Sequence, residues 1–567
     1  MLFLFFNRSK NYRPQKASAH NTRIKWIVWL LILIILGIGS RLLFLHVCAK
    51  PFLRKQGDAR TLRTVSIPSY RGLIMDRRGT PLAVSTPMDS VWINPQLFHP
   101  SAAQILTISK IISLTPESVI QKYKQNPTKS FIYLKRGINP VLSKQLQELK
   151  IKGLSIQREF RRFYPSGESV SQLIGFTNID DQGQAGLELS YNTVLKPIPG
   201  KKKVLEDQLG HWIKDIDNIQ VPRSGQDLHL SIDLRIQSLA LRELSNAIKK
   251  YGAKSGTLIM LDIETGEILA MVSAPSFNPN NLHERKGSKV RNRALTDQLE
   301  PGSTIKTFTL MSALESGQFL PNTIIDTNPG YYKIGHNIIR EIENKNLGLI
   351  SVEDILVKSS QVGISKVTWA LPPINLLNTF KKLGLGVEIY TAFPGEAAGR
   401  FPDLPKSAFT HATLAFGYGL SVTPIQLINA YATLARQGKK LGVSLLRYSA
   451  DNPDTPLPVP EAIIAQPVAK ATIAMLSKSG AKANIHGFKT AGKTGTTRVL
   501  GAQGYDAGRH VAFFAGFTPV NNPRLATLVI IEEPNEKYYY GSQVAVPVYT
   551  NVVGKALHML NVTPDNA

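Results

Sequence analysis

The sequence predicts an α+β protein with a single transmembrane helix, a β-rich middle region and a C-terminal domain made of a sheet with helices packed on it. Three observations support this fold class. One long uncharged segment lies near the N-terminus, and short β-rich runs between basic turns follow it. Beyond about residue 225, apolar runs that resemble hairpin strands alternate with amphipathic helical patterns. With 567 residues, the chain is long enough for roughly three or four domains.

The N-terminal segment joins a basic, acid-free tail to a long apolar run. Nothing from Trp26 to Ser40 is charged, and the apolar run resumes after Arg41. A helix over 24–47 would be about 36 Å long, enough to cross a hydrocarbon core of roughly 30 Å. A cleaved signal peptide is the alternative, but no small-x-small cleavage motif follows the run. We therefore expect an uncleaved anchor, and the basic tail favours a cytoplasmic N-terminus.

The region between the anchor and about residue 225 contains no constellation that indicates catalysis. Its turns are nevertheless distinctive, because Asp-Arg-Arg-Gly at 76–79 and Tyr-Pro-Ser-Gly at 164–167 are typical of tight turns. A glycine-rich stretch covers 183–188. Three consecutive lysines at 201–203 are interpreted as a solvated loop.

The C-terminal region has the pattern of a sheet with helices. Residues 228–233 alternate like a strand, and 234–248 have the period of an amphipathic helix. Apolar runs over 257–263 and 268–272 flank Glu-Thr-Gly-Glu, which is a β-hairpin pattern. Further strands are expected over 488–496, 511–516 and 525–531, followed by a helix over 547–559.

Charge and composition limit the partners. The 67 basic and 40 acidic residues give a net charge of +27, which favours anionic partners, although scattered surface lysines explain it equally well. The chain has no zinc-finger spacing, no basic-leucine heptads and no RNA-binding motif, so we expect no nucleic acid partner. The single cysteine, Cys48, excludes an intramolecular disulfide. The eleven histidines contain no His-Glu-x-x-His motif and no i, i+4 pair, so no metal site is expected.

The stretch from Pro301 to Lys306 carries the candidate nucleophile. A Pro-Gly break before apolar residues at helical spacing predicts a helix that starts near Ser303. Positions i and i+3 share one helix face, so the Ser303 hydroxyl and the Lys306 amine can come within hydrogen-bond reach, as a nucleophile beside its base. The spacing alone is a weak signal, because Ser479 and Lys482 have it too. A capping serine with a solvated lysine is the simpler alternative.

Two more motifs follow in the chain. They are Ser359-Ser360-Gln361 and Lys493-Thr494-Gly495-Thr496. The order Ser-x-x-Lys, Ser-x-Asn and Lys-Thr-Gly is the set found in penicillin-binding proteins and class A β-lactamases. The first motif opens a predicted helix and the last lies on a predicted strand, and this favours a catalytic interpretation over coincidence.

Serine acyl transfer requires a base, a proton route, a carboxylate clamp and oxyanion donors. Lys306 is the candidate base, and the like charge of Lys493 lowers its pKa so that it can accept a proton. The Ser359 hydroxyl can relay that proton to the leaving nitrogen. The remaining expected roles are a carboxylate clamp from Lys493 and Thr494, space for an extended peptide at Gly495, and an oxyanion hole from the backbone N–H groups of Ser303 and Thr496.

The sequence resembles the class B penicillin-binding proteins over nearly its whole length, and within them the septal transpeptidases. Besides the three motifs, the stretches that carry the resemblance are 71–72, 164–167, 291–293, 300–303, 416–419, 422–424 and 539–541. The resemblance implies four parts: a cytoplasmic tail at 1–23, a transmembrane helix at 24–47, a non-catalytic pedestal domain of the dimerisation type at 48–225, and a penicillin-binding transpeptidase domain at 226–567. The last would have a central antiparallel sheet flanked by helices, like the serine β-lactamases.

The resemblance also implies an activity. The serine would attack the penultimate D-alanine of a peptidoglycan stem peptide that ends in D-Ala-D-Ala, release the last D-alanine and pass the acyl group to an amine of a neighbouring strand. β-Lactams would inhibit the enzyme as mimics of this donor. The implied location is the inner membrane at the division site, as a single-pass protein with its catalytic domain in the periplasm. A septal glycan polymerase and other division proteins are the implied partners, and no cofactor is expected.

The sequence departs from the family pattern at Gln361, where Asn is usual. We expect an enzyme that is still acylated, but more slowly. A serine β-lactamase and a division-site scaffold with an impaired domain are the alternative functions.

Overall fold

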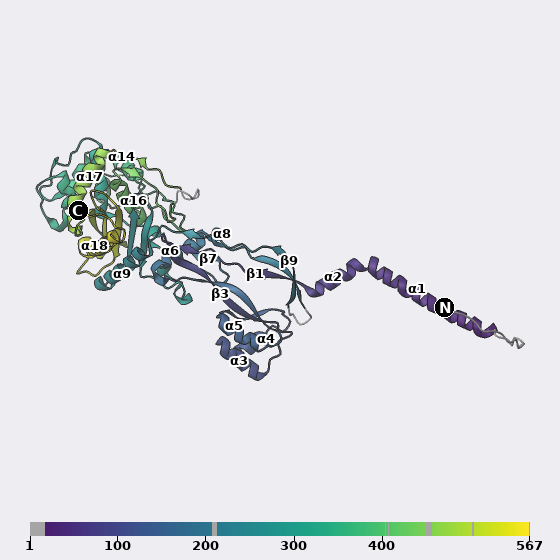
Figure 1. The fold of residues 1–567 in the computed structure, drawn as a ribbon. Coiled ribbons are helices and arrows are strands. Elements are labelled where there is room, and N and C mark those ends of the chain that lie inside the picture. The colour runs from purple at the N-terminus through teal and green to yellow at the C-terminus, as the bar shows by residue number, and fades with distance from the viewer. Residues whose placement is uncertain are drawn as a thin grey trace, which may run out of the picture. The chain divides into compact units, whose positions relative to one another are not determined.

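The computed structural model describes residues 18–206, 212–402, 404–405, 407–448, 456–501 and 504–565 (Figure 1). The chain divides into two compact units. Met1–Ile67 and Pro199–Pro222 form the first, and Pro68–Ile198 and Arg223–Ala567 form the second. All of the predicted site residues lie in the second unit.

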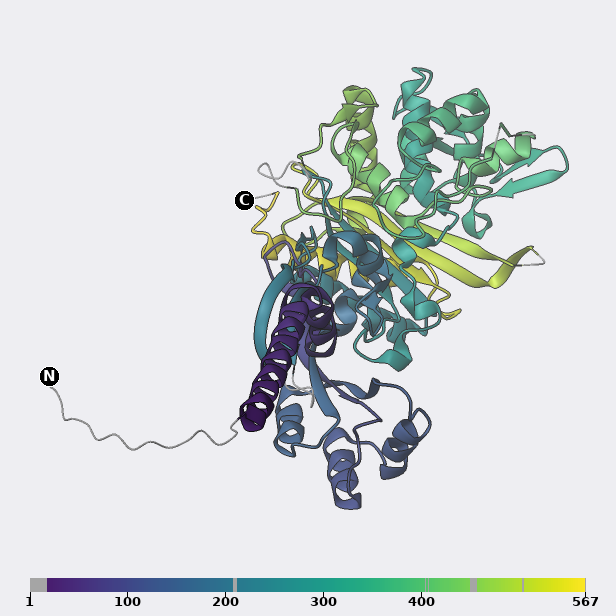
Figure 2. The ribbon, with the colours of Figure 1, turned by 90° about the vertical axis from the view of Figure 1, so that its right-hand side faces the viewer.

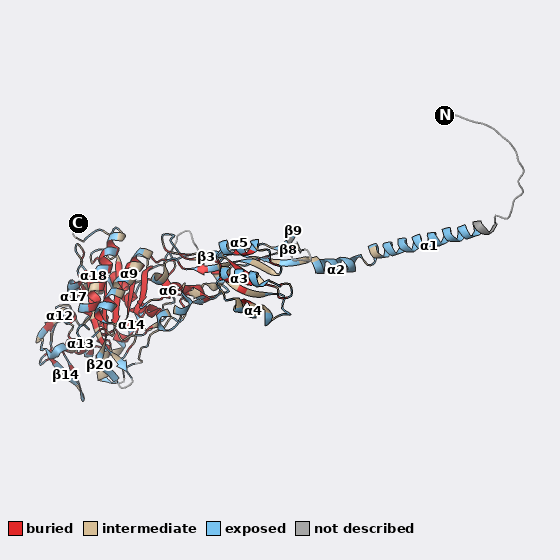
Figure 3. Cartoon of the chain, turned by 90° about the horizontal axis from the view of Figure 1, so that it is seen from below, coloured by how far each residue is buried: buried red, intermediate tan, exposed pale blue. Residues whose placement is uncertain are grey.

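The first unit contains the predicted anchor. Helix α1 (Ser18–Val47) includes an apolar stretch, Thr22–Val47, with a mean hydropathy of 2.5. Among the described residues this is the one helix long and apolar enough to cross a membrane, and nearly all of its residues from Thr22 to Val47 are exposed (Figure 3). The prediction of a single membrane-spanning helix is therefore confirmed. Residues 1–17 of the predicted tail lie outside the described residues.

A small antiparallel sheet completes the first unit, together with helix α2 (Lys50–Thr61). Its strand order is β1 (Leu62–Ile67), β8 (Gly200–Glu206) and β9 (Trp212–Gln220). The lysines at 201–203 lie in β8, so their interpretation as a loop was wrong. Side chains along β8 alternate between exposed and more buried positions, and the lysine stems therefore fit a solvated sheet while the backbone pairs on both sides.

The middle region within the second unit is a mixed domain. Its sheet has the order β10 (Leu228–His229), β2 (Ile74–Met75), β3 (Pro81–Ile93) and β4 (Ile132–Ile138), and β5 (Leu154–Phe163) also pairs with β3. Strands β2 and β3 form the predicted hairpin around 76–79. Three helices pack on this sheet and close a small core: α3 (Ala102–Ile112), α4 (Pro116–Lys124) and α5 (Pro140–Glu148). None of the three was predicted from the sequence.

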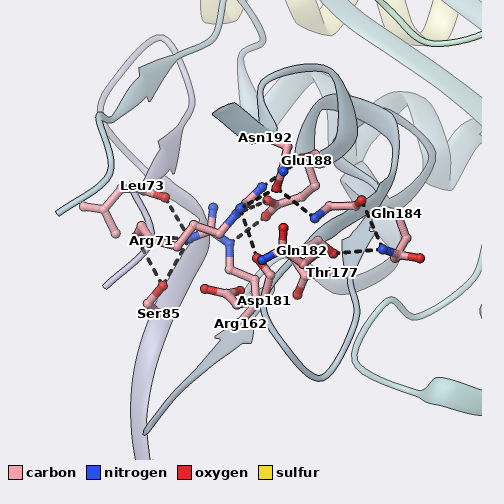
Figure 4. A network of polar contacts seen from close by, with 12 residues as sticks. Arg71, Leu73, Ser85, Arg162, Thr177, Asp181, Gln182, Gln184, Glu188 and Asn192 are labelled. Carbon is pink, nitrogen blue, oxygen red and sulfur yellow. Dashed lines mark hydrogen bonds and ion pairs between the residues drawn. The ribbon is translucent and has the colours of Figure 1, made fainter. Parts of the chain in front are cut away.

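Residues shortly before the two distinctive turns of the middle region meet the end of the 183–188 stretch in a buried ion cluster (Figure 4). The Glu188 carboxylate pairs with Arg71 Nε at 2.7 Å and with Arg162 Nε at 2.6 Å. All three side chains are almost completely buried. Because loss of one partner would leave a buried charge unpaired, these three segments depend on one another for stability.

The catalytic-type domain is built on an antiparallel sheet of order β12-β11-β21-β20-β19. The strands are β11 (Ser255–Asp262), β12 (Ile268–Ala274), β19 (Ala491–Gly501), β20 (Gly504–Thr518) and β21 (Leu525–Glu532). The prediction of a central antiparallel sheet is confirmed. In Figure 2 the long yellow-green ribbon of β19 and β20 extends beyond the helices around it.

Helices cover both faces of this sheet. Alternate residues of β11 enter different cores: Leu258 packs toward α9 (Leu234–Tyr251) and α18 (Gly541–Met559), whereas Ile259 packs toward the opposite helices. Those opposite helices are α11 (Lys306–Glu315), α16 (Pro424–Ala435) and α17 (Gln466–Ser479). Burial on both faces explains why these strands read as continuous apolar runs. Helix α18 begins at Gly541 rather than at the predicted 547. Pro547 lies inside the helix, and the Tyr540 N–H at the helix start donates to Gln543 Oε1 at 3.3 Å.

Candidate active site

Ser303 lies in a tight turn at the start of α11. Gly302–Ile305 form one turn of 3-10 helix, and the α-helix proper begins at Lys306. Gly302 has a φ of +53°, and a Cβ there would lie only 2.3 Å from Thr497 Cγ2 of strand β19. Glycine is therefore required where the serine turn packs directly against the edge of the sheet.

Buried contacts fix the backbone of this turn. The Tyr431 hydroxyl donates to the Thr304 carbonyl at 2.8 Å, and the Gly302 N–H donates to the Gly417 carbonyl at 3.3 Å. Ser303 is partly exposed, whereas Gly302 and Thr304 on either side are buried. The turn thus leaves the serine accessible on an otherwise rigid support.

Lys306 is completely buried and contacts the second motif. Its Nζ donates to the Ser359 carbonyl at 2.6 Å and lies 3.3 Å from Ser359 Oγ. Both of these hydrogen bonds go to Ser359 and not to Ser303. The predicted proton route from Lys306 to the Ser359 hydroxyl therefore has a direct geometric basis.

Two lysines in this site have lowered pKa values. Burial lowers the pKa of Lys306 well below its usual value, the nearby charge of Lys493 lowers it further, and the Glu341 carboxylate opposes the shift. Burial alone lowers the pKa of Lys493 to about 8, and its Nζ donates to the Thr494 carbonyl at 3.2 Å. Repulsion by Lys493, the cause expected from the sequence, contributes to the low pKa of Lys306, but burial is the larger cause. Below about pH 8, Lys493 keeps its charge while Lys306 more readily gives up its proton.

Ser359 has an unusual backbone conformation. Its φ is +57°, a left-handed value that costs a residue with a side chain on the order of 1–3 kcal/mol. The next residue, Ser360, caps helix α13 (Gln361–Trp369) by accepting the Gly363 N–H at 2.8 Å. Such strain persists only where surrounding contacts hold it, and it is common at functional sites.

Gln361 is anchored through its backbone. Its N–H donates to Glu341 Oε2 at 2.8 Å, and its carbonyl accepts from Ser365 Oγ at 2.7 Å. The side chain is partly exposed, and within the described ranges it has no hydrogen bond of its own. The amide that departs from the family pattern is therefore free to contact a bound molecule.

Strand β19 presents the third motif at the end of the sheet. Within the described strands it pairs with β20 alone, so its other edge is not occupied by a strand. A Cβ on Gly495 would lie 3.0 Å from Thr304 Cγ2, so this glycine allows the strand to lie close to the serine turn. Thr496 Oγ1 accepts from the Gly541 N–H at 3.1 Å, which fixes its side chain. An extended peptide could add along this free edge.

Two residues that shape the site were not predicted from the sequence. Tyr431 supports the serine turn, and Glu341 holds the Ser359–Gln361 segment. Neither belongs to a local motif, since both act through contacts with residues distant in the chain. The sequence carries no signal for either residue, because their burial becomes visible only in the fold.

Comparison with known proteins agrees with this architecture. Residues 256–554 match the penicillin binding protein transpeptidase domain, and residues 66–230 match the penicillin-binding protein dimerisation domain. The chain is 36% identical to peptidoglycan D,D-transpeptidase FtsI of Escherichia coli strain K12, covering 98% of this chain and 96% of that protein. It is also 36% identical to the probable peptidoglycan D,D-transpeptidase PbpC of Pseudomonas aeruginosa, covering 97% of each.

A solved structure gives the same result. The transpeptidase domain of penicillin-binding protein 3 from Burkholderia pseudomallei is 32% identical, with a TM-score of 0.53, and the match covers 59% of this chain and 97% of that one. Together with the two domain matches and the near-complete coverage of its relatives, this likeness establishes that the chain belongs to the class B penicillin-binding proteins, which join a dimerisation domain to a transpeptidase domain.

Proposed function

We propose that this chain is a serine D,D-transpeptidase that cross-links peptidoglycan stem peptides at the division septum. The observation that carries the proposal is the contact of the buried Lys306 amine with Ser359, beside the Ser303 turn and the free edge of β19. A buried amine with a lowered pKa is suited to accept a proton. The relatives that bear the name peptidoglycan D,D-transpeptidase support the choice of substrate.

The first half of the reaction forms an acyl-enzyme. Ser303 Oγ attacks the carbonyl carbon of the penultimate D-alanine, and its proton passes to neutral Lys306. The N–H groups of Ser303 and Thr496 stabilise the oxyanion. When the C–N bond breaks, the proton moves from Lys306 through the Ser359 hydroxyl to the leaving amine, and free D-alanine departs.

The substrate is held by the rest of the motif residues. Charged Lys493 and the Thr494 hydroxyl bind the terminal carboxylate, and Gln361 hydrogen-bonds to a donor amide. The donor chain lies along the free edge of β19, and Gly495 lets the serine turn lie close to that strand. In the second half, the amine of a neighbouring stem peptide attacks the ester carbonyl and loses its proton to Lys306. As the ester C–O bond breaks, Lys306 returns this proton to Ser303 Oγ, and the free serine and neutral lysine are regenerated.

The test of this function uses the purified full-length protein in detergent. We expect a fluorescent penicillin to label it stably, and a donor ending in D-Ala-D-Ala to give both free D-alanine and a product joined to an added amine acceptor. Rapid turnover of the label without transfer would indicate a β-lactamase. Absence of labelling would indicate a scaffold and would refute the proposal.

The location and partners extend this proposal. One N-terminal membrane-spanning helix is consistent with a single-pass protein of the inner membrane. We place the catalytic domain in the periplasm because the tail before the helix is basic and acid-free. The division site, with a septal glycan polymerase and other division proteins as partners, is proposed from the resemblance to the septal transpeptidases. A reporter that is active only in the periplasm should be active when fused after Ala567, and inactivity of a stably expressed fusion would contradict this topology.

Gln361→Asn is expected to speed acylation by penicillins. Glutamine carries the same amide on a longer side chain, and misplacing a positioning group by about 1 Å can cost on the order of 100-fold in rate. Because the Gln361 side chain is partly exposed and makes no hydrogen bond to the described residues, thermal stability should hardly change. The measurement is the second-order acylation rate for several β-lactams. Slower acylation, or no change for any of them, would mean that the site has adapted to glutamine.

A further inference from the structure

The segment that follows strand β15 (Asn337–Arg340) places one carboxylate directly behind the second motif. Glu341 is 4% exposed, and both of its oxygens are used. Ser360 Oγ donates to Oε1 in a short hydrogen bond, and the Gln361 N–H donates to Oε2 at 2.8 Å. Two adjacent residues of the motif are thus held by one buried side chain from a distant part of the chain.

The backbone of Glu341 is itself fixed. Its N–H donates to the Gly330 carbonyl at 3.0 Å, and its carbonyl accepts the Asn344 N–H at 3.1 Å. The carboxylate is therefore presented from a rigid turn. A charge-assisted pair of hydrogen bonds from such a support is stronger than neutral contacts and specifies geometry.

The strained conformation of Ser359 needs support of this kind. On its N-terminal side, the Lys358 N–H donates to the Asp354 carbonyl at 2.8 Å, which ends helix α12 (Val352–Val357). On its C-terminal side, Ser360 and Gln361 are held by Glu341. With both flanks fixed, Ser359 keeps its positive φ and turns its carbonyl and hydroxyl toward Lys306.

We propose that Glu341 is a positioning residue of the acyl-transfer reaction, whose buried carboxylate fixes the Ser359–Gln361 segment so that Ser359 stays in contact with Lys306. The proposal rests on the transpeptidase function proposed above. Glu341 does not touch the reacting atoms. It acts through Ser360 and Gln361, and through its charge.

The charge of Glu341 gives a second, independent readout. The charged groups that act on Lys306 are Lys493 of β19, which lowers its pKa, and Glu341, which raises it. Removal of the negative charge leaves burial and Lys493 unopposed, so the Lys306 pKa falls further. Since the neutral amine is the active form, the acidic limb of the pH–rate profile for acylation then moves to lower pH.

The experiment compares Glu341→Gln and Glu341→Asp with the parent protein, all in full-length form. In Glu341→Gln, an NH2 group, which donates hydrogen bonds, replaces one of the two carboxylate oxygens that accept from Ser360 Oγ and from the Gln361 N–H. We expect its acylation rate with a penicillin to fall by about 10–100-fold, as for a group displaced by roughly 1 Å, and its acidic limb to move to lower pH. Glu341→Asp keeps the charge on a shorter side chain, so acylation slows while the acidic limb stays in place.

Glu353→Gln is the matched control. Glu353 belongs to α12, and its ion pair with Lys478 at 2.6 Å is not in contact with the motifs. We expect parent-like rates and pH profile for this variant, with a melting temperature that shows the cost of losing an ordinary ion pair. A residue that served the fold alone would reduce the fraction of protein that can be labelled, without moving the acidic limb.

The outcomes separate this inference from the function on which it rests. A parent protein that is never labelled refutes the transpeptidase function itself. A parent that is labelled, with a Glu341→Gln variant of unchanged rate or unchanged acidic limb, refutes the positioning role alone. If Glu341→Gln does not fold, Glu341→Asp decides, because an aspartate variant that reacts at the parent rate overturns the proposal.

Discussion

Ser303→Ala is expected to abolish covalent labelling by penicillins and to abolish peptide transfer. In the proposed reaction this hydroxyl is the attacking group, because Ser303 is the partly exposed residue of a turn that packs against β19, next to Lys306 in the sequence motif. In enzymes whose nucleophile and base act as a unit, loss of the nucleophile costs on the order of a million-fold in rate. Mass spectrometry of the penicillin-treated parent should find the adduct on the peptide that contains Ser303.

The chain provides a matched control for this variant. Ser479 and Lys482 have the same spacing, but Ser479 is the last residue of α17. Ser479→Ala should therefore be labelled like the parent. An adduct on Ser479 or on Ser359, or persistent labelling of Ser303→Ala, would show that the nucleophile is wrongly assigned.

Lys306→Met is expected to be the second most damaging change. Removal of a general base costs typically 100- to 10,000-fold, and in the proposed reaction the same amine, 3.3 Å from Ser359 Oγ, also passes the proton to Ser359. Methionine fills a similar volume without a polar group. Since burial disfavours the charged amine, the variant should keep or raise its melting temperature while acylation collapses. A variant that loses activity only because it unfolds would show a lowered melting temperature instead.

The parent protein should show a bell-shaped pH dependence of acylation. Activity rises with pH as Lys306 loses its proton, and this limb lies well below the usual range of a lysine because its pKa is lowered. Activity falls again near pH 8, where Lys493 loses the charge that binds the substrate carboxylate. The measurement is the second-order acylation rate from pH 5 to 10, and a profile that rises without a second limb would contradict the role of Lys493.

Much of the fold follows from local pattern. The runs at 257–263 and 525–531 are apolar at most positions because they lie in the middle of a sheet covered on both faces, and this pattern is visible without any knowledge of topology. The lysine-rich β8 was not predictable in the same way. Its pairing with two neighbours is decided by distant backbone partners, whereas its own side chains are those of a solvated segment.

The candidate site, like the fold, was predictable from the sequence only in part. Its three motifs could be named because each has a characteristic spacing, and the structure brings Lys306 and Ser359 into contact. The burial of Lys306 and the support from Glu341 could not be named, since both depend on segments far apart in sequence that the fold brings together. The catalytic roles assigned to the motif residues stay predictions until the variants are measured.

The strand order of the catalytic-type domain also determines when this enzyme can first work. Strand β11 is bonded directly to β21, which is among the last strands to be synthesised, and β21 in turn carries β20 and β19. At about 5–20 residues per second, the ribosome needs on the order of tens of seconds between the two partners. During that interval the nascent β11–β12 hairpin has an unpaired apolar edge, which is prone to aggregation. In a chain that ends before β21, the sheet that positions Lys493 cannot be completed. Ribosome stalling or a late stop codon should therefore yield an inactive product rather than a weaker enzyme.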